Sequence, residues 1–309
     1  MTKNPSIAIL LAAYNGQDYL RKQLDSIVTQ TYPNWTLHAI DDGSSDQTQN
    51  ILQEYQARLG PQKMTVVTTK NQGCAKTFLT LVCEPTIQAD YYAYSDQDDI
   101  WDADKLAKAL AALASLTPNL PQLYCSGARV IDANEKPLGQ LPIKKRPPSL
   151  QNALIQCIAT GNTMVFNHLA RKILLDAGVV NVPLHDWWTY LAICASGGEC
   201  YYDMSSTLSY RQHGNNVMGF KQSFLARYLK KLNRVLNDQF IQINTSQLCA
   251  LSKIETKLTP KSIHTLNYYR RSLKGNLFTR MYYLYQSGVY RQEILGTMGV
   301  YLALIIGKL

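Results

Sequence analysis

The sequence predicts an α/β protein: a mostly parallel sheet flanked by helices, followed by a basic helical extension. In the first 130 residues, short apolar runs alternate with segments whose apolar residues have helical spacing. Hydrophobic residues make up 46% of the 309 residues and charged residues 17%, which excludes a disordered chain. Beyond Lys221 the pattern becomes helical and basic. These three observations define the fold class.

The elements can be assigned in order along the chain. Residues 6–13 form a continuous apolar run, which is typical of a strand buried on both faces. Residues 19–30 follow with Leu20, Leu24 and Ile27 at helical spacing. Further strands are expected at 35–40, 64–68, 91–95, 123–131 and 159–166, and further helices at 46–59, 74–83, 102–116 and 184–194. Crossovers of this length join parallel strands, and the Pro- and Lys-rich stretch 140–148 predicts a loop.

The charge divides the chain into two parts. Residues 221–309 contain 14 Lys and Arg against 3 Asp and Glu, whereas the remainder has 17 basic and 19 acidic residues. We therefore expect a nearly neutral domain over 1–220 and a basic, Tyr-rich helical extension over 221–309. The net charge of +9 indicates an anionic partner without naming one.

Cysteine usage and the chain ends favour a cytoplasmic protein. The seven Cys form no CxxC pair or metal-ligand spacing, which favours reduced, mostly structural thiols. The first residues do not resemble a signal peptide. The apolar stretch 294–309 is too short and too often interrupted by Gly for a membrane span.

Two acidic clusters follow predicted strands. Asp41 and Asp42 follow the strand at 35–40, and Asp96, Asp98 and Asp99 follow the strand at 91–95. In parallel sheets, ligands bind beyond the carboxyl ends of the strands. Three carboxylates in four residues repel one another, and oxygen ligands of this kind suit Mg²⁺ or Mn²⁺.

Structural roles compete with this interpretation. Asp99 and Asp102 could cap the helix that follows them. Asp42 and Asp46 fit turn and N-cap positions around Gly43, and for these two the structural role is the better explanation.

Seven short segments, taken in order, resemble the motif series of glycosyltransferase family 2. They are AAYNG (12–16), QTYPNW (30–35), DDGSSD (41–46), NQG (71–73), SDQDDIW (95–101), HDWW (185–188) and YRQHGNN (210–216). The last two resemble the bacterial rhamnosyltransferase branch, and above all the enzymes that build streptococcal rhamnose-containing wall polysaccharides. The match spans about residues 6–220. It implies a GT-A fold and an inverting, metal-dependent transfer of L-rhamnose from dTDP-L-rhamnose to a lipid-linked glycan acceptor in cell-wall polysaccharide synthesis.

The resemblance also implies roles for individual residues. Asp186 occupies the position of the catalytic base. The nucleotide-binding positions are Ala13, Tyr14, Asp41, Asp96 and Arg211. The metal positions, for Mn²⁺ or Mg²⁺, are Asp96, Asp98 and His213, and Trp187 and Trp188 would line the acceptor and sugar pocket. The motif here is Asp-Gln-Asp-Asp and not a plain Asp-x-Asp, which leaves Asp99 as an alternative metal ligand.

Each of these roles has a structural alternative. Asp186 could cap a helix beginning at Trp187. Trp187 and Trp188 could equally be core aromatics. A lone His213 in a Gly- and Asn-rich loop is usually solvated, although its neighbour Arg211 favours diphosphate binding.

The chemistry of sugar transfer agrees with these assignments. The leaving diphosphate must be neutralised, which a divalent ion at Asp98 can do. The acceptor hydroxyl must lose its proton as it attacks, which is the task of a carboxylate such as Asp186. One base and direct displacement invert the anomeric centre.

Other functions remain open on the sequence. A sugar-phosphate nucleotidyltransferase would also use a carboxylate-bound metal, but no Gly-rich triphosphate loop follows the first strand. A non-enzymatic protein could bind polyanions through the basic extension. That extension fits a homodimer interface or a contact with the inner face of the plasma membrane, and it has no recognisable nucleic-acid motif.

Overall fold

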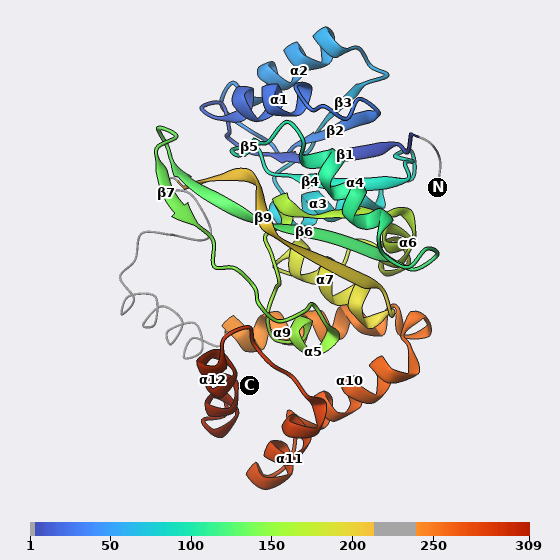
Figure 1. Ribbon diagram of the computed structural model, residues 1–309, viewed down its shortest axis with the longest axis vertical. Coiled ribbons are helices and arrows are strands. Elements are labelled where there is room, and N and C mark those ends of the chain that lie inside the picture. Colours follow the sequence, from blue (N-terminus) through green and yellow to red (C-terminus); the bar gives the residue numbers. More distant parts are fainter. Residues whose placement is uncertain (1–3, 213–238) are drawn as a thin grey trace.

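The computed structural model describes residues 4–212 and 239–309. His213, one of the predicted metal ligands, and residues 221–238 of the predicted extension lie outside this part of the chain. Figure 1 shows a sheet between two layers of helices, with further helices beyond one of these layers.

The described residues contain one nine-stranded sheet. Its strands are β1 (Ile7–Ala13), β2 (Trp35–Asp41), β3 (Met64–Thr68), β4 (Tyr91–Ser95), β5 (Ile100–Trp101), β6 (Gln122–Asp132), β7 (Pro137–Gln140), β8 (Val165–Asn167) and β9 (Glu199–Gln212). The order is β3-β2-β1-β4-β8-β6-β9-β5, with β7 paired to β6. The first four strands in this order are parallel, whereas β8 is antiparallel to both of its neighbours. The sheet is therefore parallel where the predicted site lies and mixed beyond it.

The helices of the sheet domain cover both faces. They are α1 (Leu20–Val28), α2 (Thr48–Leu59), α3 (Cys74–Cys83), α4 (Lys105–Ala114), α5 (Leu150–Ala153), α6 (His168–Ala177) and α7 (His185–Ala195). In β1, Ile7, Ile9 and Leu11 pack in one hydrophobic cluster with α1, α2 and α4. Ala8 and Leu10 pack in the other with α3, α6 and α7. All five are fully buried, which confirms the strand predicted to be buried on both faces.

The C-terminal helices form a further layer (Figure 1). They are α9 (Gln239–Ser252), α10 (Pro260–Ser272), α11 (Leu277–Ser287) and α12 (Ile294–Ile305). Thr259 caps α10 and Asn276 caps α11, each through a side-chain oxygen that accepts a backbone N–H. Leu251, Leu266 and Leu284 belong to the same hydrophobic cluster as α7. The predicted helical extension is thus confirmed over 239–305, and it packs on the sheet domain.

Three strands were missing from the sequence prediction: β5, β7 and β9. The fourteen residues of β9 include Ser, Thr, Tyr and Asp in place of an apolar run, although the strand lies inside the sheet. The two-residue strand β5 is too short to give a periodic signal. The strand expected at 159–166 is mostly a 3₁₀ turn, Gly161–Thr163, followed by the short β8.

Candidate active site

The parallel strands place three loops at one edge of the sheet. β1 lies between β2 and β4, so the chain moves to one side of β1 after the first crossover and returns to its other side at β4. Such a switch point opens a crevice at the carboxyl ends of the strands. The loops after β1 and β4 contain Tyr14 and Asp96–Asp99, and β2 ends at Asp41, which Asp42 follows directly.

The loops after β1 and β2 are bonded to each other. The backbone N–H of Asn15 donates to Ser44 Oγ at 2.9 Å, and that of Gly16 donates to Thr48 Oγ1 at 2.7 Å. In return, Asn15 Oδ1 accepts from the N–H of Ser45 at 2.9 Å. Asn15 has φ of +46°, a conformation that Asn tolerates better than most residues. The two loops therefore hold a fixed shape.

Asp41 has one carboxylate oxygen satisfied and one not. Its Oδ1 accepts from both the N–H and the hydroxyl of Ser44. Its Oδ2 is buried and accepts no hydrogen bond from any residue that the structure describes. A buried acceptor left unpaired costs about 1–3 kcal/mol. A donor group on a bound molecule would remove this cost.

Asp42, by contrast, is fully used by the chain. Its carboxylate accepts from the N–H groups of Gln72 at 3.0 Å and Gly73 at 2.9 Å and from the hydroxyl of Thr69 at 3.2 Å. Gly73 has φ of +89°, so the turn needs glycine there. Asp42 therefore has a structural role, but in the turn before α3 and not in the turn around Gly43 that the sequence predicted.

Gln97 joins the loops after β1 and β4. Its Oε1 accepts from the N–H of Tyr14 at 2.8 Å, and its Nε2 donates to the carbonyl of Tyr14 at 2.9 Å. A Cβ at Gly16 would lie 2.2 Å from Gln97 Oε1, so a side chain there would displace the Gln97 amide from its position against Tyr14. No role was predicted for Gln97 from the sequence. Its position between the acidic residues of the motif was the available signal.

The three aspartates of the acidic loop lie in two environments. Asp96 and Asp98 are partly exposed. Burial and the neighbouring charges of Asp98 and Asp186 raise the pKa of Asp96 to about 8. Asp99 is fully buried and accepts hydrogen bonds from Asn162 Nδ2 and the backbone N–H of Arg211. Asp99 is thus a structural carboxylate, and Asp98 is the better candidate for a metal ligand.

A buried lysine contacts Asn162, the residue whose side-chain amide donates to Asp99. Lys105 is fully buried, donates from Nζ to the carbonyl of Asn162 at 2.9 Å, and lies 4.6 Å from the centre of the Trp101 ring. Burial lowers the pKa of Lys105 to about 7. The Ala- and Leu-rich pattern of α4 gave no indication that this lysine points inward.

Arg211 supports the backbone of the acidic loop. The side chain is 1% exposed, and its Nε donates to the carbonyl of Asp98 at 2.9 Å. Its other nitrogens donate to the carbonyl of Ala133 at 3.1 Å and to Glu135 at 3.4 Å, and its guanidinium lies over the Tyr19 ring. These contacts position Asp98. Direct contact between Arg211 and a nucleotide stays a prediction.

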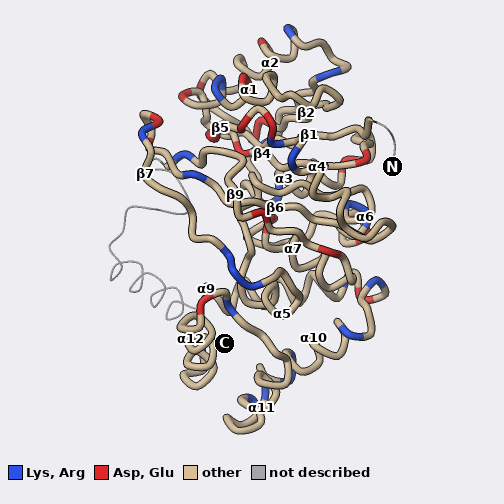
Figure 2. The backbone as a smooth tube through the Cα atoms, viewed as in Figure 1, with Lys and Arg blue, Asp and Glu red and all other residues tan. Residues whose placement is uncertain are grey.

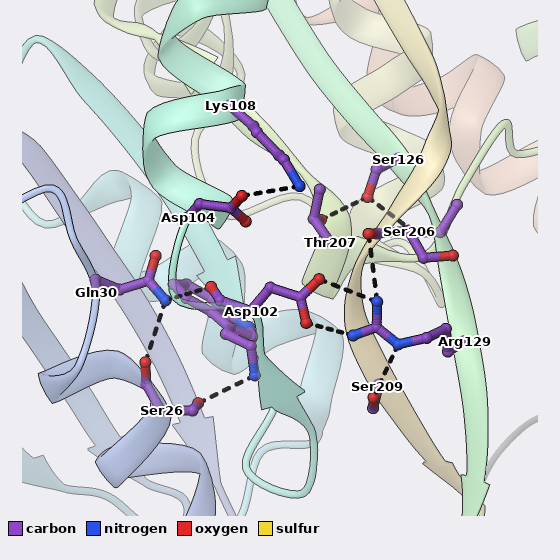
Figure 3. Close-up of polar contacts among 12 residues, drawn as sticks. Ser26, Gln30, Asp102, Asp104, Lys108, Ser126, Arg129, Ser206, Thr207 and Ser209 are labelled. Atoms are coloured by element: carbon purple, nitrogen blue, oxygen red, sulfur yellow. Dashed lines mark hydrogen bonds and ion pairs between the residues drawn. The ribbon is translucent and has the colours of Figure 1, made fainter. Parts of the chain in front are cut away.

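The segment after the acidic loop is held from two sides (Figure 3). Asp102 forms an ion pair with Arg129 of β6, whose Nε donates to Ser209 of β9 at 3.3 Å. The carbonyl of Asp102 accepts from Gln30 at 2.7 Å. Asp104 stands at the N-cap of α4 without a side-chain capping bond. The alternative that Asp102 caps this helix is therefore wrong, because its carboxylate is bound to Arg129.

Asp186 lies in the first turn of α7, about ninety residues along the chain from the acidic loop. Its Oδ1 accepts from the N–H of Trp187 at 2.7 Å. Burial raises the pKa of Asp186 to about 6. A Cβ at Gly161 would lie 3.3 Å from the Cβ of Asp186, so glycine lets the chain pass closely. The fold thus brings Asp186 near enough to Asp96 for its charge to raise the pKa of Asp96.

The residues around Asp186 belong to the core. His185 stacks on Phe78 with ring centres 4.0 Å apart, and burial lowers its pKa to about 3. Trp188 is fully buried, and Trp187 is 7% exposed and donates from Nε1 to the carbonyl of Ala153 at 2.6 Å. Both indoles pack in the core, which favours the alternative that they are core aromatics. That they line the acceptor and sugar pocket stays a prediction.

The predicted site is therefore partly assembled by the described residues. Ala13 is buried at the end of β1, and the Tyr14 side chain beside it is 48% exposed. Asp41 ends β2, Asp96 and Asp98 lie in the loop after β4, and Asp186 lies in the first turn of α7. In residues 4–212 and 239–309, no three His, Cys, Asp or Glu side chains are grouped as a metal site.

Comparisons with known proteins agree on one class of protein, the glycosyltransferases. The family model of glycosyl transferase family 2 matches residues 8–174. A dTDP-rhamnosyl transferase, RfbG of Shigella flexneri, is 30% identical over 236 residues, which cover 74% of this chain and 79% of that protein. A putative teichuronic acid biosynthesis glycosyltransferase of Bacillus subtilis is 32% identical over 106 residues, covering 34% of this chain and 41% of that protein.

Solved structures show the same fold at low identity. S. aureus TarS 1–349 in complex with UDP-GlcNAc has a TM-score of 0.55 and 14% identity, covering 92% of this chain and 93% of that chain. The mannosyltransferase PcManGT from Pyrobaculum calidifontis, in complex with GDP-Man and Mn²⁺, has a TM-score of 0.50 and 18% identity, covering 99% and 88%. The predicted GT-A fold is confirmed. With its strand-end loops, its acidic motif and the match over more than half its length, the chain belongs to glycosyltransferase family 2.

Proposed function

We propose that this glycosyltransferase is a metal-dependent, inverting rhamnosyltransferase that uses dTDP-L-rhamnose and a lipid-linked glycan acceptor in bacterial cell-wall polysaccharide synthesis. One observation carries the proposal. A partly exposed acidic pair, Asp96 and Asp98, lies at the switch point, and the charge of Asp186, from the distant helix α7, reaches Asp96. The name of the Shigella relative supports dTDP-rhamnose as the donor.

The nucleotide is proposed to bind beside Asp41. The unpaired Oδ2 of Asp41 is buried at the end of β2 and would accept a hydrogen bond from the N3–H of a pyrimidine base. Tyr14, held through its backbone by Gln97, borders the same loop. Two structures that share the fold have nucleotide sugars bound, UDP-GlcNAc and GDP-Man.

Asp96 and Asp98 have the chemistry to hold Mg²⁺ or Mn²⁺. Burial and then the neighbouring charges of Asp98 and Asp186 raise the pKa of Asp96, and a bound cation would offset these charges. Mg²⁺ characteristically binds one or two carboxylates together with waters and substrate phosphates, so two carboxylates suffice. A bound ion would neutralise charge on the departing diphosphate.

The chain's own residues would perform the proton transfer. Asp186, when deprotonated, would accept the proton of the acceptor hydroxyl as that oxygen attacks the anomeric carbon. The new C–O bond forms as the bond to the diphosphate breaks, and displacement from the opposite face inverts the centre. Arg211 and Asp99 keep the acidic loop in place during the reaction.

A thermal-shift experiment tests the donor and metal assignments together. The protein should gain most stability with dTDP and Mn²⁺, more than with UDP or GDP, because a ligand stabilises only the fold that binds it, by about 2.7 kcal/mol at one hundred times Kd. Asp98→Asn should abolish the Mn²⁺-dependent part. Asp104→Asn is the matched control, because Asp104 has an exposed carboxylate paired with Lys108. This variant should respond to Mn²⁺ like the wild type. Equal shifts in both variants would remove Asp98 from the metal site.

The pH dependence of turnover tests the base. Because burial raises the pKa of Asp186 to about 6, the carboxylate is protonated and inactive below this value. We expect kcat/KM to rise about tenfold per pH unit below pH 6 and to level off above it. The measurement is dTDP release at saturating Mn²⁺ between pH 4.5 and 8. A profile flat down to pH 4.5 would contradict the assignment.

A further inference from the structure

Helix α12 is apolar on both of its faces. Its inner residues Val300 and Leu304 are buried in the hydrophobic cluster shared with α7. Its outer residues include Ile294, Leu295 and Met298, which are 79%, 65% and 61% exposed. No charged residue occurs within 294–305. A surface helix ordinarily carries polar residues on its outer face, so this face is suited to a nonaqueous partner.

Helix α11 extends the same surface. Phe278, Tyr282 and Tyr285 occupy one stripe of the helix at i, i+4 and i+7 and are 87%, 56% and 72% exposed. The two helices are in contact, and Arg280 donates from Nη2 to the carbonyl of Leu309 at 3.3 Å. We call the exposed apolar residues of these helices the α11–α12 surface. They are Leu277, Phe278, Tyr282, Tyr285, Ile294, Leu295, Met298, Leu302 and Ile305.

The charge around this surface is strongly one-sided. Residues 271–309 contain five basic side chains and one acidic side chain, Glu293 (Figure 2). The basic residues are Arg271, Lys274, Arg280, Arg291 and Lys308. In a symmetric pair of copies the same patches would meet, and their basic residues would repel one another. Arg271 and Lys274 are exposed, whereas Arg280, Arg291 and Lys308 are partly buried. An apolar surface that contains Tyr and Phe, with exposed basic side chains in the same segment, is instead complementary to an anionic lipid headgroup layer over acyl chains.

The dimensions favour a helix lying on the membrane. Twelve residues of α12 span about 18 Å, compared with about 30 Å for a hydrocarbon core. In the described part of the chain, no helix is long and apolar enough to cross a bilayer. We propose that the α11–α12 surface rests on anionic phospholipid, with its apolar side chains at the level of the headgroups.

The surface is linked to the proposed base through a short series of contacts. Arg291, just before α12, donates from Nη1 to the carbonyl of Ile155 at 3.0 Å. Two residues before Ile155, the carbonyl of Ala153 in α5 accepts from Nε1 of Trp187, and Trp187 directly follows Asp186 in the chain. Lipid contact would therefore hold the start of α7 at a fixed height above the membrane. Delivery of a lipid-linked acceptor to Asp186 rests on the proposed function, whereas lipid contact itself does not.

Vesicle cosedimentation tests the surface. The full chain should sediment with vesicles of phosphatidylglycerol and phosphatidylcholine and much less with phosphatidylcholine alone. In the double variant Leu295→Glu/Met298→Glu, the affinity for the anionic vesicles should fall on the order of tenfold, because two carboxylates enter the contact. Met204→Glu on β9 is the matched control, since Met204 is 59% exposed and Met298 is 61% exposed. It should bind like the wild type.

The outcomes separate this proposal from its rivals. No vesicle binding by the wild type, or equal loss in Met204→Glu and the double variant, would overturn it. So would a dimer in light scattering that the double variant dissociates while vesicle binding is absent. The dTDP and Mn²⁺ thermal shift of the double variant should equal that of the wild type. Vesicle binding with no nucleotide response would overturn the proposed function and leave the lipid contact standing.

Discussion

Asp186→Asn should lower kcat on the order of 10³-fold while leaving donor binding almost unchanged, because it removes the proposed base and little else. The asparagine side chain has the same shape, and its amide oxygen can still accept from the N–H of Trp187, so the first turn of α7 keeps its hydrogen bond. The amide cannot take a proton from the acceptor hydroxyl. The measurement is dTDP release from dTDP-L-rhamnose with a lipid-linked glycan acceptor, at saturating Mn²⁺.

Two controls make this result specific. The thermal shift with dTDP and Mn²⁺ should match that of the wild type, because Asp186 is not a proposed ligand of either. The ascending limb below pH 6 should vanish from any residual activity, since the titrating carboxyl is gone. Near-normal turnover with the pH limb intact would assign the base to another residue. If the thermal shift with dTDP and Mn²⁺ were lost together with turnover, Asp186 would have a donor-binding role instead.

The sequence predicted the parallel half of the fold well because its elements have local signals. β3, α3 and β4 begin and end where the apolar runs and helical spacing placed them. The edge where the strand-end loops meet then follows from the topology of parallel sheets. β9 could not be predicted in this way. Its residues are polar, and it forms a strand because it pairs with β6, which only the folded chain brings beside it.

The environment of the acidic loop could not be read from its four residues. Asp98 and Asp99 are adjacent and chemically identical, yet Asp99 is buried because Asn162 and the backbone of Arg211 lie against it. Those partners are distant in sequence. Lys105 is close to Asp99 in sequence, but the pattern of its helix does not show that this side chain is buried. A buried polar group requires its partners, but the sequence does not say which residues they are.

Arg211 offers the sharpest test of this distinction, because its two candidate roles predict different results for Arg211→Lys. In the structure its guanidinium donates hydrogen bonds to the carbonyls of Asp98 and Ala133 and to the carboxylate of Glu135. An ammonium group keeps the charge but cannot reproduce this planar fork. The protein without ligands should therefore lose about 3 kcal/mol of unfolding free energy, since buried acceptors are left unpaired.

The comparison is with Arg21→Lys, a matched substitution in the exposed ion pair with Glu54, which should leave the stability almost unchanged because solvent screens the pair. Denaturant unfolding measures both variants, and the Mn²⁺-dependent thermal shift then reports whether the acidic loop has moved. A supporting role lowers the stability of the ligand-free protein and weakens the response to Mn²⁺, because the Asp98 backbone is released. A diphosphate-binding role leaves the ligand-free protein as stable as the wild type and weakens only nucleotide affinity. That second pattern would return Arg211 to the nucleotide site and remove it as the support of Asp98.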